Sequence, residues 1–591
     1  MGCAALHLSC IRRWIAAPLY IFLGGVLLAQ SSRAADDGAD QVERRIPGVA
    51  VEPPQAMPII NPDAVPPPPA DAPRESIPIP DRWRLVEALG VHARWYDPYN
   101  QNTLKADRPL WDDWFVNLSL ISDTVIEPRR FPVPVSPASS RQPGALDVFG
   151  GRNQDVFNQN LILGLVLYQG DTTFKPPEYE FRFTPVVNYN RVSVDEDRVL
   201  SIDPSRGRSR NDHHIGIQEL FVDKHLRNVS DRYDFDSLRV GIQPFNVDFR
   251  GFLFQDEPFG VRLFGTRANN LYQYNLAWFR RIEKDTNSGL NDLGQSLRKD
   301  DVFIANLYRQ DFPVTGFTSQ GAIIYNRNRE DHPFYDNNGF LVRPASLGTE
   351  RPRTYDVTYL GYNGDGHVGW LNITASTYAA LGREKPGLFV DQPSNIRAWF
   401  AAAEASRDFD WLRLRVSALY GSGDDNPYDH TSKGFEAILE NPIFAGADTS
   451  FWIRQPVPNI GGGGVSLSGR NGILNSLRAS KDQGQSNFTN PGIALLGVGA
   501  DFDVLPELRV SANLNHLAFA DTRVLQVARA QANIDKDIGW DASLSLIYRP
   551  LMSQNIILRL SGAVLLPGTG FKQLYGDDKS YSILGNVILA Y

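Results

Sequence analysis

The stretch from Ser580 to Tyr591, SYSILGNVILAY, alternates with a period of two residues. Because successive side chains of a strand point to opposite faces, the stretch predicts a strand with one apolar and one polar face, with Leu584 and Ile588 as exceptions. Such a strand suits either the half-buried sheet of a soluble sandwich or the lipid-facing wall of an outer-membrane β-barrel. The apolar face carries Tyr581, Ile583, Val587, Leu589 and Tyr591.

The first 35 residues have the pattern of a secretory signal peptide. Arg12 and Arg13 precede an apolar run at residues 15–28, and small residues follow it. The run is too short to predict a membrane-spanning helix, and no later segment offers about 18 uninterrupted apolar residues. Both cysteines, Cys3 and Cys10, lie in this leader. The mature chain is therefore expected to lack disulfides and any site built on cysteine.

The composition agrees with a barrel. The chain has 591 residues, 42% of them hydrophobic, and a mean hydropathy of -0.28. A barrel is this polar because only every second strand residue meets lipid. The net charge of -8 gives no indication of nucleic-acid binding.

The basic residues are mostly arginine, since only eleven of the 59 are lysine. A guanidinium keeps its charge and presents a planar fork to carboxylates and phosphates. Two interpretations stay open: an arginine-lined lumen for anions, or a genome biased toward arginine codons.

Three regions follow from the pattern along the chain: the signal peptide at 1–35, a proline-rich segment at 36–82 and the barrel at 83–591. Proline removes backbone donors, so residues 36–82 are expected to form a disordered periplasmic lead-in that could dock a periplasmic partner. From residue 83 on, alternating strands and polar loops predict an all-β fold, a transmembrane antiparallel β-barrel of 16–18 strands. The strand signal is weaker at residues 215–226 and 397–407.

Long connections are expected near residues 127–156, 328–353 and 423–490. Long loops of such barrels are extracellular, whereas periplasmic turns are short. The longest one either folds inward and constricts the pore or decorates the surface. No segment before the barrel is long enough for a folded plug domain, which argues against a TonB-dependent transporter.

Candidate pore-lining residues follow from strand parity, that is, from whether a residue falls on the apolar or the polar face of its alternating strand. Arginines on the lipid face would cost on the order of 2–4 kcal/mol each at mid-depth, so parity places them in the lumen. There they either attract anions, as rings of arginine do in anion pores, or pair with acids such as Glu180 and Asp541. The candidates are Arg182, Arg239, Arg413, Arg415, Arg509, Arg559 and Glu180. Tyr581 and Tyr591 on the last strand are candidates for the signal that the barrel assembly machinery recognises.

Catalysis and metal binding have little support. The nine histidines are scattered and form no triad or ligand motif. Asp424 and Asp425 in a glycine-rich loop are expected to be solvated turn residues, with calcium binding as the alternative. We therefore expect no enzyme activity, no metal and no cofactor.

Two short segments resemble known families. Leu238-Arg-Val-Gly-Ile-Gln-Pro-Phe245 resembles a strand of large Gram-negative porins. Val416-Ser-Ala-Leu-Tyr-Gly-Ser-Gly-Asp-Asp425, followed by Phe435, resembles a strand-to-loop segment of alginate-export-type outer-membrane proteins. The two stretches cover 18 of the 591 residues and do not extend to the proline-rich lead-in. The resemblance implies a single-chain barrel of about eighteen strands with gating loops.

The expected function is passive passage of hydrophilic, mainly anionic, solutes across the bacterial outer membrane. Its partners would be outer-membrane lipid, the barrel assembly machinery and small solutes, with no nucleic acid. One alternative is an exit channel for an exopolysaccharide. Another is a structural or surface-binding barrel with a blocked lumen, which conductance would distinguish from the other two.

Overall fold

The computed structural model describes most of the chain beyond residue 101. It covers residues 102–591 except 134–150, 171–175, 231, 233, 332, 344–352, 388, 456, 460–469 and 474–480, together with Gly90, Arg94 and Asp97. The chain divides into two compact units, 1–79 and 80–591, and every described residue belongs to the second. The expected signal peptide and nearly all of the proline-rich segment lie outside the described residues. Within the described part, no helix is long and apolar enough to cross a membrane.

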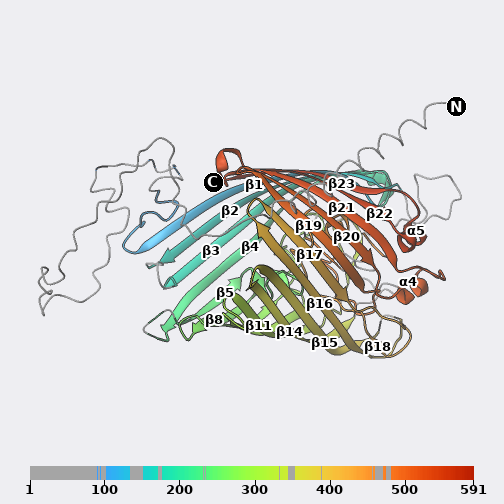
Figure 1. Ribbon diagram of the computed structural model, residues 1–591, viewed down its shortest axis with the longest axis horizontal. Helices are drawn as coiled ribbons and strands as arrows, with labels where there is room; N and C mark the ends of the chain where they lie inside the picture. The colour runs from blue at the N-terminus through green and yellow to red at the C-terminus, as the bar shows by residue number, and fades with distance from the viewer. Residues whose placement is uncertain are drawn as a thin grey trace, which may run out of the picture. The chain divides into compact units, whose positions relative to one another are not determined.

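Eighteen strands form one closed antiparallel barrel, in which each strand pairs with the next and β1 pairs with β23 (Figure 1). The predicted fold class, a transmembrane antiparallel barrel of 16–18 strands, is confirmed at its upper limit. The strands are β1 (Trp114–Arg130), β2 (Asn153–Gln169), β3 (Tyr179–Val194), β4 (Ser209–Asn228), β5 (Phe235–Ile242), β8 (Phe259–Arg267), β9 (Tyr272–Arg280), β10 (Asp300–Arg309), β11 (Phe317–Asn328), β14 (Thr354–Val368), β15 (Leu371–Lys385), β16 (Ser394–Phe409), β17 (Leu412–Gly421), β19 (Ile493–Leu505), β20 (Leu508–Ala518), β21 (Asp537–Tyr548), β22 (Ile556–Pro567) and β23 (Ser580–Ala590).

The other elements are short and lie in the connections. They are β6 (Phe245–Asn246), β7 (Gln255–Asp256), β12 (Phe334–Tyr335), β13 (Leu341–Val342), β18 (Thr431–Ser432), α3 (Phe451–Arg454), α4 (Arg523–Ala528), α5 (Thr569–Tyr575) and the 3-10 turns η2 (Pro204–Arg206) and η3 (Pro550–Met552). Because they are brief, the antiparallel ladder of the barrel supplies almost all of the regular structure.

The barrel wall reverses the pattern of a soluble protein. Leu496, Val498 and Leu560 on the outward face are 66%, 53% and 54% exposed, whereas Asn190 and Asn326 on the inward face are fully buried. Exposed apolar area this extensive is rare on soluble monomers. A barrel with a lipid-facing exterior and a polar interior explains the exposed apolar area, because lipid covers the outward side chains.

The two ends of the barrel differ in their connections. At one end, here called the turn end, the strands are joined by links as short as residues 369–370, 410–411 and 506–507. At the opposite end, the loop end, the links include residues 329–353 and 422–492. Long loops are extracellular in such barrels, so the loop end faces outward from the cell.

The first long connection is shorter than the sequence indicated. Residues 127–156 were expected to form it, but β1 continues to Arg130 and β2 begins at Asn153. The residues at these two strand ends, most of them polar, continue the backbone pairing, as in Arg129 with Gln154 and Arg130 with Asn153. Backbone pairing therefore extends beyond the apolar band, where side-chain alternation no longer indicates a strand.

Candidate functional site

The six candidate arginines lie on the inward side of their strands. Each alternates with outward side chains that are partly or largely exposed; Arg415, for example, stands between Leu414 and Val416, which are 37% and 59% exposed. Four of them lie along the wall on β3, β5, β17 and β22. Arg413 and Arg509 lie at the turn end, where their side chains are 49% and 44% exposed.

Every one of these arginines has an acidic partner. Their charges are therefore balanced locally, as expected under the alternative of structural ion pairs. The pairs are Arg182 with Glu180 at 2.9 Å and Glu219 at 3.4 Å, Arg239 with Asp223 at 2.8 Å, Arg413 with Asp408 at 2.5 Å, Arg415 with Asp501 at 2.7 Å, Arg509 with Asp503 at 2.6 Å and Arg559 with Asp448 at 3.6 Å.

Asp541, the other acid named with Glu180, has a different role. Its carboxylate accepts hydrogen bonds from the backbone amides of Phe451 and Trp452 at 3.0 and 2.9 Å. These amides begin α3, so Asp541 on β21 caps a turn of helix that belongs to the long connection. A carboxylate at such a position satisfies orphan donors and suits the helix dipole.

The long connection between β17 and β19 folds inward. Its Phe435, Leu439, Phe444 and Trp452 are at most 3% exposed. They pack on inward-facing aromatic side chains of the wall: the rings of Phe400 on β16 and Phe435 are stacked with centroids 5.0 Å apart. Of the two possibilities for this loop, the structure therefore selects inward folding.

Three buried arginines outside the strands hold this loop to neighbouring connections. Arg298 donates to the carbonyl oxygens of Asp482 at 3.0 Å and Gly484 at 2.7 Å. Arg343 and Arg353 donate in the same way to Gln483 at 3.1 Å and Ser486 at 3.0 Å. Each also forms an ion pair, with Glu330, Glu283 and Glu384 respectively.

Sequence reasoning missed these anchoring arginines. They lie in the connections 281–299 and 329–353, where no strand parity indicates which way a side chain points. The only signal was the excess of arginine over lysine. A forked guanidinium can bind a carboxylate and still donate to backbone carbonyls, which lysine does less well.

One part of the lumen wall places two arginines side by side, one of which has no ion-pair partner among the described residues. Arg239 on β5 and Arg262 on β8 are directly paired across the two strands, and one carboxylate, Asp223, neutralises Arg239. Arg262 donates to Asn275 at 2.7 Å, and no carboxylate among the described residues lies within ion-pair distance of it. The Arg262 guanidinium also lies 4.5 Å from the ring centre of Phe264. The pair forms a cationic and aromatic patch on the inward face.

A lysine flanked by two glutamates lies inside the folded loop. Lys481 forms ion pairs with Glu436 and with Glu440, the latter at 3.1 Å, and both glutamates are buried. All three belong to residues 422–492, outside the membrane-spanning strands. Burial raises the pKa of Glu436 to about 7; Lys481 opposes this shift and Glu440 adds to it.

This pKa predicts a pH dependence of stability. A carboxyl group with a raised pKa binds its proton more tightly in the folded chain, so stability falls as the pH rises from about 4.5 to about 7 and is level above that. We expect the Glu436→Gln variant to lose this part of the pH dependence, measured as thermal unfolding in detergent at pH steps from 4 to 8. Glu507→Gln, in the turn between β19 and β20, is the control. An unchanged profile in Glu436→Gln would contradict the prediction.

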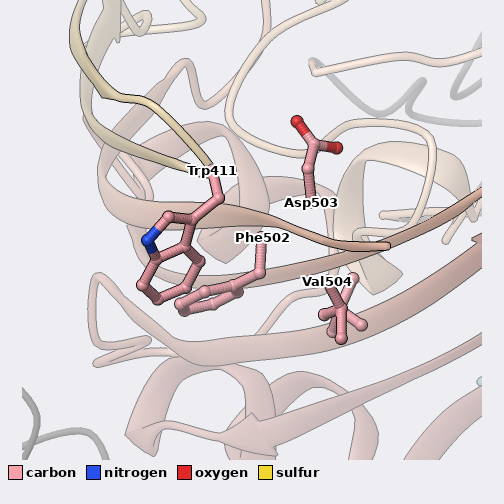
Figure 2. A pocket seen from close by; sticks show the side chains of 5 residues that line it. Trp411, Phe502, Asp503 and Val504 are labelled. Carbon is pink, nitrogen blue, oxygen red and sulfur yellow. The ribbon is translucent and has the colours of Figure 1, made fainter. Parts of the chain in front are cut away.

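A pocket at the turn end has a different character. It measures about 450 Å³ and is lined by Trp411, Phe502, Asp503, Val504 and Val510 (Figure 2). Phe502, Val504 and Val510 point outward, and Val504 is 55% exposed. Aromatic side chains are enriched where such barrels meet the membrane interface, so this pocket belongs to the lipid-facing surface and not to the lumen.

Tyr581 and Tyr591 lie at opposite ends of β23. Tyr581 is an outward residue at the loop end, 36% exposed. Tyr591 continues the pairing with β1 by exchanging backbone hydrogen bonds with Leu120. Lys105 lies 4.0 Å above its ring, and Asn102 donates to its hydroxyl at 3.2 Å. Residues 102–105 thus cover the part of the β1 edge that β23 does not reach.

The closed barrel, the lipid-facing exterior and the unequal ends define the class of protein: a single-chain β-barrel of the outer membrane. The barrel of about eighteen strands implied by the porin resemblance is the one observed. The resemblance to alginate export stays a prediction.

No known protein family matches the sequence, and no curated protein matches it either. Several solved structures are similar to this chain over 80% of its length. Pseudomonas aeruginosa OccK9 (OpdG) has 14% identity, 97% of its own chain covered and a TM-score of 0.44. Pseudomonas aeruginosa OccK7 (OpdD) has 11% identity, 98% of its own chain covered and a TM-score of 0.44. Acinetobacter baumannii OccAB3 has 10% identity, 99% of its own chain covered and a TM-score of 0.43.

Proposed function

We propose that this protein is an outer-membrane channel through which small hydrophilic solutes pass passively, with a preference for anions. The observation that carries the preference is the Arg239–Arg262 pair with its single carboxylate. The preference does not rest on the six arginines predicted from parity as a group, because the charge of each is balanced by a neighbouring acid. A lumen arginine that no described carboxylate binds is free to attract anions, as arginine rings do in anion pores.

The folded loop supplies the selectivity barrier in this proposal. Residues 435–455 occupy space inside the barrel, where nearly all of their side chains are buried and Ile443 and Asp448 are exposed. A channel narrowed in this way passes small solutes and excludes polymers. The proposal therefore favours a solute channel over the exit of an exopolysaccharide.

The test is the reversal potential of single channels in a planar bilayer under a tenfold salt gradient. We expect an anion preference in the unmodified protein that is weakened in Arg262→Gln. Arg413→Gln, whose cation is paired with Asp408 at the exposed turn end, is the control and should leave the reversal potential unchanged. An anion preference equal in Arg262→Gln and the unmodified protein would overturn the assignment to this pair.

A barrel with a closed lumen is the second candidate. The observation that favours it is the dense packing around the loop. Its Phe435 and Phe444 form a buried aromatic cluster with Phe400 of β16 and Phe252 of the connection between β5 and β8. In that case the loops at the loop end would carry the function. Absence of conductance from a correctly folded barrel would support this candidate over the channel.

A further inference from the structure

The outward face of the barrel carries a group of basic residues at the loop end. Arg327 is next to the last residue of β11, Arg383 and Lys385 end β15, and Arg397 lies near the start of β16. All four side chains are exposed and share the face of the apolar band. We call these four residues the outer basic patch.

Strand register brings the patch together. Arg327 pairs with Asp356 on β14, Asp356 pairs with Arg383, and Arg383 pairs with Asn395 on β16. Arg397 lies two residues from Asn395 on the same face. Neighbouring strands are about 4.8 Å apart, so the patch spans about 15 Å along the wall.

These cations form no ion pair with the residues that the structure describes. No carboxylate of the described residues lies within ion-pair distance of Arg327, Arg383, Lys385 or Arg397, which makes the patch unlike the six lumen arginines predicted from the sequence. Asp356, the acid between them, is already bound by Arg329 at 2.6 Å and by the hydroxyl of Tyr325 at 2.8 Å. Four exposed like charges in one patch are costly unless a counter-charge comes from outside the chain.

Apolar side chains continue the same face toward the middle of the barrel. Leu381 and Trp399, two residues from Arg383 and Arg397, are 48% and 51% exposed. Trp399 stacks on Tyr420 with ring centroids 4.6 Å apart, forming a flat aromatic surface below the patch. The patch therefore lies where acyl chains end and lipid headgroups begin.

We infer that the outer basic patch binds the phosphate groups of a phosphorylated lipid in the leaflet at the loop end, with its acyl chains on Leu381, Trp399 and Tyr420. Arginine forks match phosphate oxygens, and the apolar side chains below complement the chains. A soluble phosphate would leave that apolar surface without a role, so the occupant is a lipid. The inference rests on the membrane placement of the proposed function and is independent of conduction.

The test uses the full mature chain in phosphatidylcholine nanodiscs that contain diphosphorylated lipid A, with bound lipid counted by native mass spectrometry. A basic side chain near an anionic membrane surface contributes about 1 kcal/mol, which corresponds to about fivefold in affinity. We expect the triple variant Arg327→Gln, Arg383→Gln and Arg397→Gln to bind this lipid about a hundredfold more weakly. Lipid A without phosphates should bind equally weakly to both proteins.

Arg191→Gln is the matched control. Arg191 is an exposed outward arginine at the loop end of β3, but its register partners are Phe157 and Asn211 and not other basic residues. The affinity of the Arg191→Gln variant for diphosphorylated lipid A should stay within about twofold of that of the unmodified protein. Equal lipid binding in the triple variant, or binding that ignores the phosphates, would overturn the inference.

The same preparations separate this inference from the proposed function. A triple variant that loses lipid but retains conductance and anion preference supports both. A protein that binds lipid through the patch but never conducts supports the patch and overturns the channel. A chain that does not enter the bilayer at all overturns both.

Discussion

Replacing residues 436–487 with a four-residue Gly-Ser linker is expected to raise the single-channel conductance severalfold. The segment fills the interior of the barrel with side chains such as Phe444 and Trp452, so its removal opens the cross-section. The design is feasible because the two arms of the loop meet where the segment begins. The amide of Gly434 donates to the carbonyl of Phe488 at 2.8 Å, and the side chain of Asn490 donates to the carbonyl of Phe435 at 2.9 Å.

The control for this deletion removes a connection of similar location that faces solvent. Residues 203–206, which contain η2, are exposed and belong to the loop end. Their replacement by a short linker should leave the conductance unchanged. Heat-dependent migration in gels shows whether the variant without residues 436–487 folds into a barrel. If the folded variant has the same conductance as the unmodified protein, the loop does not limit the passage of ions.

Arg298→Gln is expected to lower the free energy of unfolding by on the order of 3 kcal/mol. Arg298 and Glu330 form a forked pair at 2.7 and 2.9 Å, and both side chains are buried. Removing one partner of a buried pair leaves the other charge without compensation, which costs several kcal/mol. The substitution also takes a donor from the carbonyls of Asp482 and Gly484. Unfolding by urea in lipid vesicles measures the effect.

Arg509 provides a control of the same geometry. It forms a forked pair with Asp503 at 2.6 and 2.9 Å, but at the turn end, where both side chains are nearly half exposed. Exposed pairs contribute about 0–1 kcal/mol, so Arg509→Gln should have little effect. The double variant Arg298→Gln with Glu330→Gln should recover part of the lost stability. If Arg298→Gln and Arg509→Gln lowered the free energy of unfolding equally, the role assigned to burial would be contradicted.

Strand parity was sufficient to predict the fold where one face of a strand is polar and the other is apolar. In β3, Phe181 and Phe183 alternate with Glu180 and Arg182, and the inward face is polar. The signal was weak at β16 because its inward residues, such as Ile396 and Phe400, are buried against the folded loop. Both faces of that strand are then apolar, and alternation no longer separates them.

The lumen chemistry could be predicted only in part. Parity predicts that Arg182 and Arg415 face inward, but it does not predict their partners Glu219 and Asp501, which lie on adjacent strands. Which residues stand opposite each other depends on register, which turns and loops determine and a single sequence does not state. The anchoring arginines of the connections, Arg298 above all, act through contacts with a segment almost 190 positions away.

The seam between β1 and β23 has a kinetic consequence. Ile121 pairs with Ala590, so the last ladder to form joins positions about 470 residues apart. Every other ladder of the wall joins strands that follow one another in the chain, apart from the connection across 422–492. Contacts of such long range form slowly, because the entropy of the intervening chain is lost before they contribute. Until then both edge strands offer unpaired backbone groups. Among the described residues, 102–105 cover a short part of the β1 edge, at Asn117 and Leu118. Both β23 and residues 121–130 of β1 are therefore edges at which an assembling barrel is open to a strand of another chain.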